Sequence, residues 1–333
     1  MGRRNKSDDD GVRPAVQGFP LMLSRTAENL FWTARYMERA DFLARILGSA
    51  LRLSSMPAAY AGQNLWESVI ASAGAPEPFY AKHAKATEKS VRDFLAFDPD
   101  NPSSIWSCLA VARANGRSVR TALTTEMWER INDAWHTLER QNASKMDREA
   151  FGEFLEWVED VTLAFDGSSR RTMLRNDSYW FLRLGGAVER ADNTARIIDV
   201  KYHLLLPERE AVGGGLDYFQ WTTILREVSA LTAYHWVYRD SIKPWLVADL
   251  LILNSQMPRS LASCYDVAVR HLDLLADAYG QRGQSQRLAH GVQARMASAR
   301  IDDIFQSGLH EFISGFLVDN AEVASAIAEQ YLV

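Results

Sequence analysis

The sequence predicts an all-α protein built as a tandem-duplicated helical bundle, and three observations lead to this fold class. Long runs carry apolar residues at helical spacing, as in residues 147–165 and 217–239. No segment of useful length alternates apolar and polar residues as a strand does. One helical segment occurs twice, which is the sequence signature of a repeated unit. We expect the two halves to pack as one body about a pseudo-twofold axis, because one self-complementary surface then serves both.

The repeated segment spans residues 22–47 and 173–198. Both copies contain the pattern E-R-A-D-x-x-A-R-I, in which Glu38 corresponds to Glu189 at an offset of 151 residues (189 minus 38). Each copy also carries the dipeptide M-L about fifteen residues upstream of this pattern. A match of this length predicts a duplicated helix around which each half is organised.

Two further matches follow the repeated helix in the same order. Trp66 corresponds to Trp221, and two P-x-S-x-x-S-C segments end at Cys108 and Cys264. The offset grows from 151 to 156 residues, as a few insertions in loops would produce. The expected division is a disordered tail, a first half and a second half: residues 1–21, 22–165 and 173–333.

The helices are expected between Pro- and Gly-containing breaks. The first runs from Thr26 to Gly48 without an internal Pro or Gly. Ser103 follows a Pro-rich break and is expected to cap the next helix. The breaks are expected at residues 56–57, 74–78, 98–102, 166–169, 207, 213–215 and 257–258.

Composition narrows the class of protein. Of 333 residues, 47% are hydrophobic and 24% charged, which is ordinary for a soluble globular protein. The net charge of −5 gives no basic footprint for nucleic acid. No apolar run is long enough to span a membrane, and the N-terminus lacks the apolar stretch of a signal peptide. Two cysteines cannot form a disulfide framework or a cysteine zinc site, so we expect a cytoplasmic location.

A polar stripe crosses the otherwise apolar repeated helix. Glu38, Asp41 and Arg45 fall within a narrow sector of the helical wheel. A helix that is apolar nearly all round is buried, so its charges need partners, and Asp41 and Arg45 have the favourable i,i+4 order. The second copy repeats the stripe with Glu189, Asp192 and Arg196. If the copies meet, the two stripes are expected to form one buried cluster.

Three interpretations of this cluster stay open. It is a structural ion-pair network, or a pocket in which arginines bind a carboxylate or phosphate, or a metal site. Di-metal bundles use Glu-x-x-His, whereas no histidine stands three residues after Glu38 or Glu189, so we predict no metal. These two glutamates are the candidate general acid or base if the chain is an enzyme. The seven histidines show no zinc spacing, and the cysteines are expected to be core residues.

Longer motifs then resemble one known family. They are MLSRTAENLFWTARYMERAD near the start, NPSSIWSCLAVAR in the first half, WFLRLGGAVERADNTAR in the second half and MPRSL later. From residue 22 to its end the chain is similar to the alpha-E family, an all-helical bacterial family. Members are encoded beside, or fused to, circularly permuted ATP-grasp proteins and transglutaminase-like proteins. The resemblance implies a part in peptide or amide ligation, with those two proteins as possible partners and no cofactor specified.

The resemblance also marks site residues. The family pattern tends to place an arginine three residues before the second motif Glu, as Arg35 stands before Glu38, but Gly186 occupies that place here. A symmetric clamp would therefore lack one arginine. The candidate pocket comprises Arg25, Arg35, Glu38, Arg39, Asp41, Arg45, Glu189, Arg190, Asp192, Arg196 and Arg259. The expected role is a substrate-binding accessory protein of an ATP-grasp ligase, the alternatives being an enzyme or a scaffold.

Overall fold

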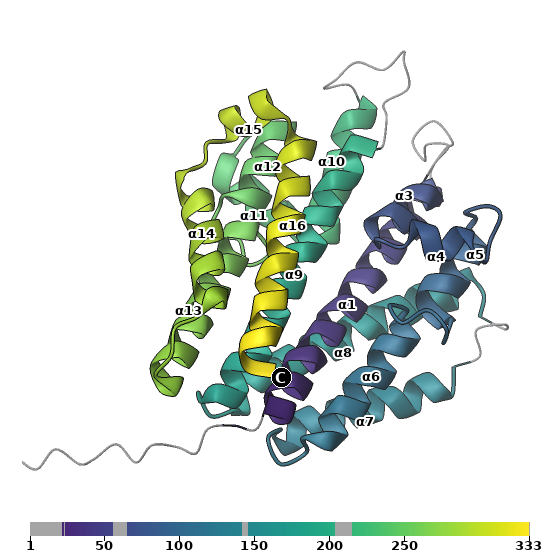
Figure 1. Cartoon of the computed structure of the whole chain (residues 1–333). Coiled ribbons are helices and arrows are strands. Elements are labelled where there is room, and N and C mark those ends of the chain that lie inside the picture. Colours follow the sequence, from purple (N-terminus) through teal and green to yellow (C-terminus); the bar gives the residue numbers. More distant parts are fainter. Residues whose placement is uncertain (1–21, 23, 56–64, 142–145, 204–214, 333) are drawn as a thin grey trace, which may run out of the picture.

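The computed structural model describes residues 22, 24–55, 65–141, 146–203 and 215–332, of which the side chains at 200–203 and 215–217 are not described. Over this part of the chain every regular element is a helix and no strand occurs (Figure 1). The all-α prediction is therefore confirmed. The tail expected at 1–21 and the breaks expected at 56–57, 207 and 213–215 lie wholly or largely outside the described residues.

The helices keep one numbering throughout. In chain order they are α1 (Ser24–Ser54), α3 (Leu65–Ser72), α4 (Pro76–Tyr80), α5 (Glu88–Arg92), η1 (Asp93–Phe97), α6 (Ile105–Ser118), α7 (Thr125–Glu139), α8 (Arg148–Thr172), α9 (Asp177–His203), α10 (Gly215–Glu227), α11 (Leu231–Tyr238), α12 (Pro244–Ile252), α13 (Leu261–Tyr279), α14 (Gln284–Ser298), α15 (Ile301–Ser307), α16 (Leu309–Ile327) and η3 (Ala328–Leu332). Both elements marked η are π-helical. None of the helices described here is long and apolar enough to cross a membrane.

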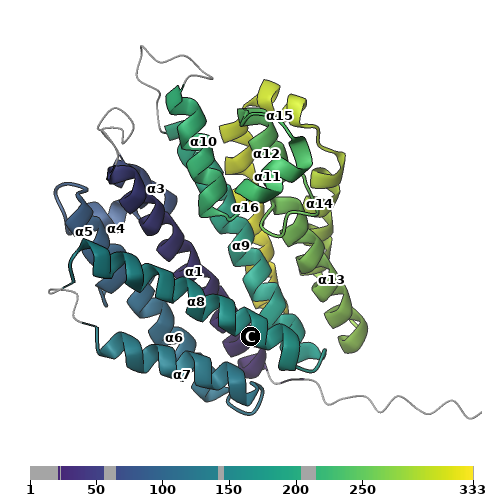
Figure 2. The ribbon, with the colours of Figure 1, turned by 180° about the vertical axis from the view of Figure 1, so that it is seen from behind.

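Helices α1 and α9, which carry the repeated segment, lie side by side in the middle of the molecule and run in the same direction (Figure 1). Helices α3, α6 and α8 pack against α1, and α13 and α16 pack against α9. Seen from behind, α8 crosses α1, and α7 packs against α8 (Figure 2). The C-terminal η3 also contacts α1. Neighbouring helices thus cover the two central helices on several sides, and Glu38, Asp41 and Glu189 are buried between them.

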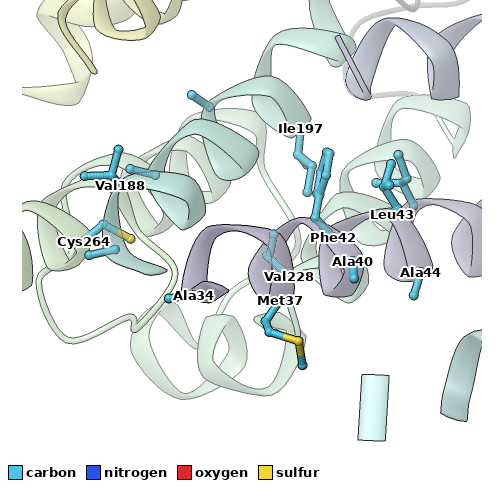
Figure 3. Close-up of a cluster of buried hydrophobic side chains, with 14 of the residues drawn as sticks. Ala34, Met37, Ala40, Phe42, Leu43, Ala44, Val188, Ile197, Val228 and Cys264 are labelled. Carbon is cyan, nitrogen blue, oxygen red and sulfur yellow. The ribbon is translucent and has the colours of Figure 1, made fainter. Parts of the chain in front are cut away.

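The two central helices touch through small residues. A Cβ built on Gly185 of α9 would lie 2.2 Å from the backbone oxygen of Phe31 in α1, so only glycine permits this approach. Further along, apolar side chains fill the contact. Figure 3 shows Phe42 of α1 beside Ile197 of α9 in a buried cluster. Burial of such side chains contributes about 1.5–3 kcal/mol each.

Three local expectations were wrong. The break expected at 166–169 lies inside α8, where Asp166 and Arg170 form an i,i+4 ion pair of 2.7 Å that supports the helix. The run 217–239 is divided between α10 and α11, because Ser229 takes a left-handed φ of 54°. The cap of α6 is Ser104, not Ser103, and its side chain accepts a hydrogen bond from the Ser107 amide.

Candidate functional site

Each of the two buried glutamates on α1 and α9 is bound by arginines of the other helix. The guanidinium of Arg190 donates from Nε and Nη2 to the two oxygens of Glu38, at 2.9 and 2.6 Å. Glu189 accepts from the Nε of Arg39 at 2.6 Å and the Nε of Arg35 at 2.7 Å. Both glutamates are buried, with 8% and 2% of their surface exposed. The dipeptides Glu38-Arg39 and Glu189-Arg190 therefore pair reciprocally across the helix contact.

The pair at Glu38 extends into a larger network, here called the Glu38 network. Arg259, in the loop before α13, donates to Glu38 at 2.9 Å and to Asp41 at 2.6 Å. Asp41 also accepts two hydrogen bonds from Arg45, at 2.8 and 3.0 Å, which is the predicted i,i+4 pair. Arg45 continues to Glu159 of α8 at 3.0 Å. The network thus ties α1 to α8, α9 and the loop before α13.

The second group, the Glu189 network, is smaller. Arg39, which pairs with Glu189, also donates a hydrogen bond to the hydroxyl of Ser103 at 3.2 Å. The Ser103 side chain therefore contacts this network instead of capping α6. The Arg35 guanidinium lies 4.7 Å from the centre of the Trp32 ring, a cation–π contact. In the described part of the chain no ion pair joins the Glu38 and Glu189 networks. The single cluster expected from the sequence is therefore two networks.

The electrostatics keep Asp41 and Glu189 charged. Burial opposes ionisation of Asp41, but the guanidiniums of Arg259 and Arg45 outweigh burial and hold its pKa at about 2. Burial likewise opposes ionisation of Glu189, and the neighbouring Arg39 and Arg35 hold its pKa below the usual range. A general acid or base needs a pKa near the working pH. A Glu189 carboxylate with a lowered pKa is suited to charge pairing instead.

Two pockets open beside the networks. The Glu38 pocket, of about 90 Å³, lies between α1, α8, α9 and the start of α13, and its charged lining is Glu38, Asp41, Arg45, Asp166, Arg183, Arg190 and Arg259. The Glu189 pocket, of about 160 Å³, lies on α1 and α9 near Gly74, and its polar lining is Arg39, Ser103, Glu189, Asp192, Asn193 and Arg196. Both are smaller than the roughly 300–1,000 Å³ of pockets for drug-sized ligands. They have room for small polar groups.

The structure brings together most of the predicted pocket residues. Of these, Asp192 and Arg196 form a separate i,i+4 pair of 2.7 Å that lines the Glu189 pocket. Arg35 belongs to the Glu189 network but lines neither pocket. Arg25 is the exception, because it is exposed in the first turn of α1, belongs to neither network and lines neither pocket. Including Arg25 in the pocket was therefore wrong. It stands more than three helical turns before Glu38, too far along α1 to reach it.

Sequence reasoning missed several participants. Arg183 stands seven residues before Arg190 and hence on the same face of α9, so extending the helical wheel of the second copy would have found it. Asn193 lies inside the repeated pattern, where the first copy has Phe42, and that exchange was the available signal. Glu159 reaches the network only through the packing of α8 on α1. No local sequence pattern predicts such a tertiary contact.

Other reactive groups do not assemble into a centre. Cys108 and Cys264 are buried, and burial raises the pKa of both thiols to about 12, so neither is ionised at neutral pH. Burial lowers the pKa of His271 to about 4. Among the described residues, no three His, Cys, Asp or Glu side chains gather as a metal ion would require.

Comparison with known proteins places the chain in one family. A family model described as a predicted alpha-helical domain with a conserved ER motif matches residues 22–332. Comparisons with curated proteins and with solved structures gave no significant match. Because the family model covers nearly the whole sequence, the chain belongs to the Alpha-E family.

Proposed function

We propose that this Alpha-E protein binds a small anionic group, a carboxylate above all, in the Glu38 pocket, and presents it as the accessory partner of an ATP-grasp amide ligase. One observation carries the binding part of the proposal. Four arginines and three carboxylates line the pocket, so its charged lining has an excess of one positive charge. A carboxylate is the natural occupant of such a site, because arginine binds it through paired, charge-assisted hydrogen bonds.

Arg183 is the arginine with capacity to spare. Its side chain is 10% exposed and pairs through Nη1 with Asp166, while Nε and Nη2 have no hydrogen-bond partner within the described residues. Burial lowers the pKa of Arg183; the Asp166 carboxylate works in the opposite direction, and the neighbouring Arg170 and Arg190 add to the lowering. Arginine nevertheless stays protonated. A bound anion would relieve this partly compensated positive charge.

The duplication belongs to the same proposal. Of five Glu-Arg dipeptides in the sequence, those at 129–130 and 139–140 are exposed and that at 208–209 lies outside the described residues. We assign the family's ER motif to the two reciprocal dipeptides on α1 and α9. The reciprocity supports two halves related by a pseudo-twofold axis, with the first half extended from residue 165 to 172 because α8 ends there.

The second half has Gly186 where the first half has Arg35, and an arginine from another position replaces the missing one. Glu189 is bound by Arg39 and by Arg35, whereas Glu38 is bound by Arg190 and by Arg259. In the repeat, Gly186 stands where the first copy has Arg35, and Arg259 stands where the first half has Ser103. Each glutamate therefore keeps two arginines, the second one supplied from a different element in each half.

The catalytic alternative is less well supported. The lowered pKa of Glu189 makes it a poor general base, and its two oxygens are occupied by arginines. The ligase and the transglutaminase-like partner rest on the family resemblance. They are tested by comparing amide-ligation rates of the neighbouring ATP-grasp protein with and without this chain. A rate unchanged by the chain would refute the accessory role.

Anion binding is tested by thermal unfolding in sodium acetate against sodium chloride of equal ionic strength, since a ligand that binds the folded state raises the melting temperature. We expect acetate to raise it for the wild type and for the exposed control Arg130→Met. We expect Arg183→Met to abolish the acetate-specific increase. An equal increase in Arg183→Met, or none in the wild type, would overturn the assignment.

A further inference from the structure

The Glu189 pocket contains a buried donor without a partner. Asn193 on α9 is 6% exposed, and its side-chain Nδ2 has no hydrogen-bond partner within the described part of the chain. A buried polar group left unsatisfied costs about 1–3 kcal/mol. Since Asn193 lines the Glu189 pocket, the space beside it is where a partner for this donor would lie.

Asp192 and Arg196, on either side of Asn193 in the sequence, also have unused hydrogen-bonding atoms and line the same pocket. Arg196 uses Nε to pair with Oδ2 of Asp192, and neither its terminal nitrogens nor Oδ1 of Asp192 makes a hydrogen bond to a described residue. Gly74, with φ of 65°, packs against this guanidinium, and a Cβ there would lie 2.6 Å from Nη1. The pocket therefore offers donors and an acceptor within one turn of α9.

The charge balance differs from that of the Glu38 pocket. Two arginines, Arg39 and Arg196, and two carboxylates, Glu189 and Asp192, line the pocket, and Arg35 also pairs with Glu189 from outside the lining. A ligand with only one charge would leave either the Asn193 and Arg196 donors or the Asp192 oxygen without a partner. A ligand that carries both charges satisfies donors and acceptor together.

We infer that the Glu189 pocket binds a small zwitterion of the α-amino-acid type, whose carboxylate accepts from Asn193 and Arg196 and whose ammonium donates to Asp192. The pocket volume of about 160 Å³ exceeds the roughly 10–15 Å³ of the same measure that one water molecule needs, so there is room for a small amino acid. This site is separate from the Glu38 pocket, and its assignment does not depend on anion binding there.

The test is titration calorimetry with L-alanine, sodium acetate and methylamine hydrochloride as probes. We expect L-alanine to bind at least tenfold more tightly than either single-charge probe, a difference of about 1.4 kcal/mol. Two near-isosteric variants, Asn193→Leu and Asp192→Asn, are each expected to weaken L-alanine binding at least tenfold. Leucine is a tolerable replacement, because the first copy has the apolar Phe42 at that place.

The control separates the two pockets. Arg183→Met alters the Glu38 pocket alone, so it is expected to leave L-alanine binding unchanged. Absence of L-alanine binding to the wild type, or equal binding by Asn193→Leu, would show that only water serves the Asn193 donor and would overturn the inference. Acetate binding that equals L-alanine binding and is lost in Asn193→Leu would also overturn it, in favour of a simple anion site.

Discussion

Replacing Glu189 by glutamine tests the buried ion pairs most sharply. The side chain is 2% exposed and holds Arg35 and Arg39, whose side chains are 14% and 23% exposed. Glutamine keeps the shape but removes the negative charge, which leaves two guanidiniums facing a neutral amide. Breaking a buried pair by removing one partner costs about 3–5 kcal/mol. Because both arginines retain some contact with water and one carbonyl acceptor remains, we expect the lower end, about 3 kcal/mol.

The assay is urea unfolding followed by circular dichroism at neutral pH, with free energies obtained by linear extrapolation. Glu129→Gln is the matched control, because Glu129 belongs to an exposed Glu-Arg dipeptide on α7. Exposed substitutions of this kind stay within about 0.5 kcal/mol. A loss below about 1 kcal/mol for Glu189→Gln would refute the view that these pairs stabilise the contact of α1 with α9.

Three further predictions concern the same helices. Asp41, whose pKa is lowered from 3.8 to about 2, contributes about 2 kcal/mol to the free energy of unfolding; this contribution is present above pH 4 and is lost as the pH falls toward 2. An Asp41→Asn protein that loses as much stability as the wild type over this pH range would contradict the prediction. Gly185→Ala should lower the melting temperature by several degrees, because its Cβ meets the α1 backbone; an unchanged value would show that the helices separate freely. Arg259→Ser should lower the free energy of unfolding in urea by about 2 kcal/mol, because Glu38 and Asp41 lose a donor. Adding Gly186→Arg to this variant should restore more stability than adding Gly186→Ala. Equal recovery by the two would reflect helix propensity alone.

The sequence was informative where the physics is local. Helical spacing was enough to predict α1 and α9, and the four-residue separation of Asp41 and Arg45 was enough to predict their ion pair. Arg259 was reached through the resemblance to family motifs. All three depend on patterns within a short segment or a recognisable motif.

What was missed depends on tertiary packing. Nothing local indicates that Glu38 takes Arg190 rather than its neighbour Arg39, because that choice follows from the side-by-side packing of two distant helices. The continuation of α8 through Gly167 depends on Asp166, which Arg183 of α9 also holds. A glycine in a helix costs only about 1 kcal/mol, so such contacts outweigh it.

The central claim, that reciprocal Glu–Arg pairs join the two repeated helices, is tested most directly by a double-mutant cycle on Glu38 and Arg190. Urea unfolding of Glu38→Gln, Arg190→Met and the double variant gives the coupling energy between the two side chains. The two-bond geometry, at 2.9 and 2.6 Å, predicts a coupling of about 1.5–3 kcal/mol. Losses that add to within about 0.5 kcal/mol would show that the two residues act independently and would contradict the account.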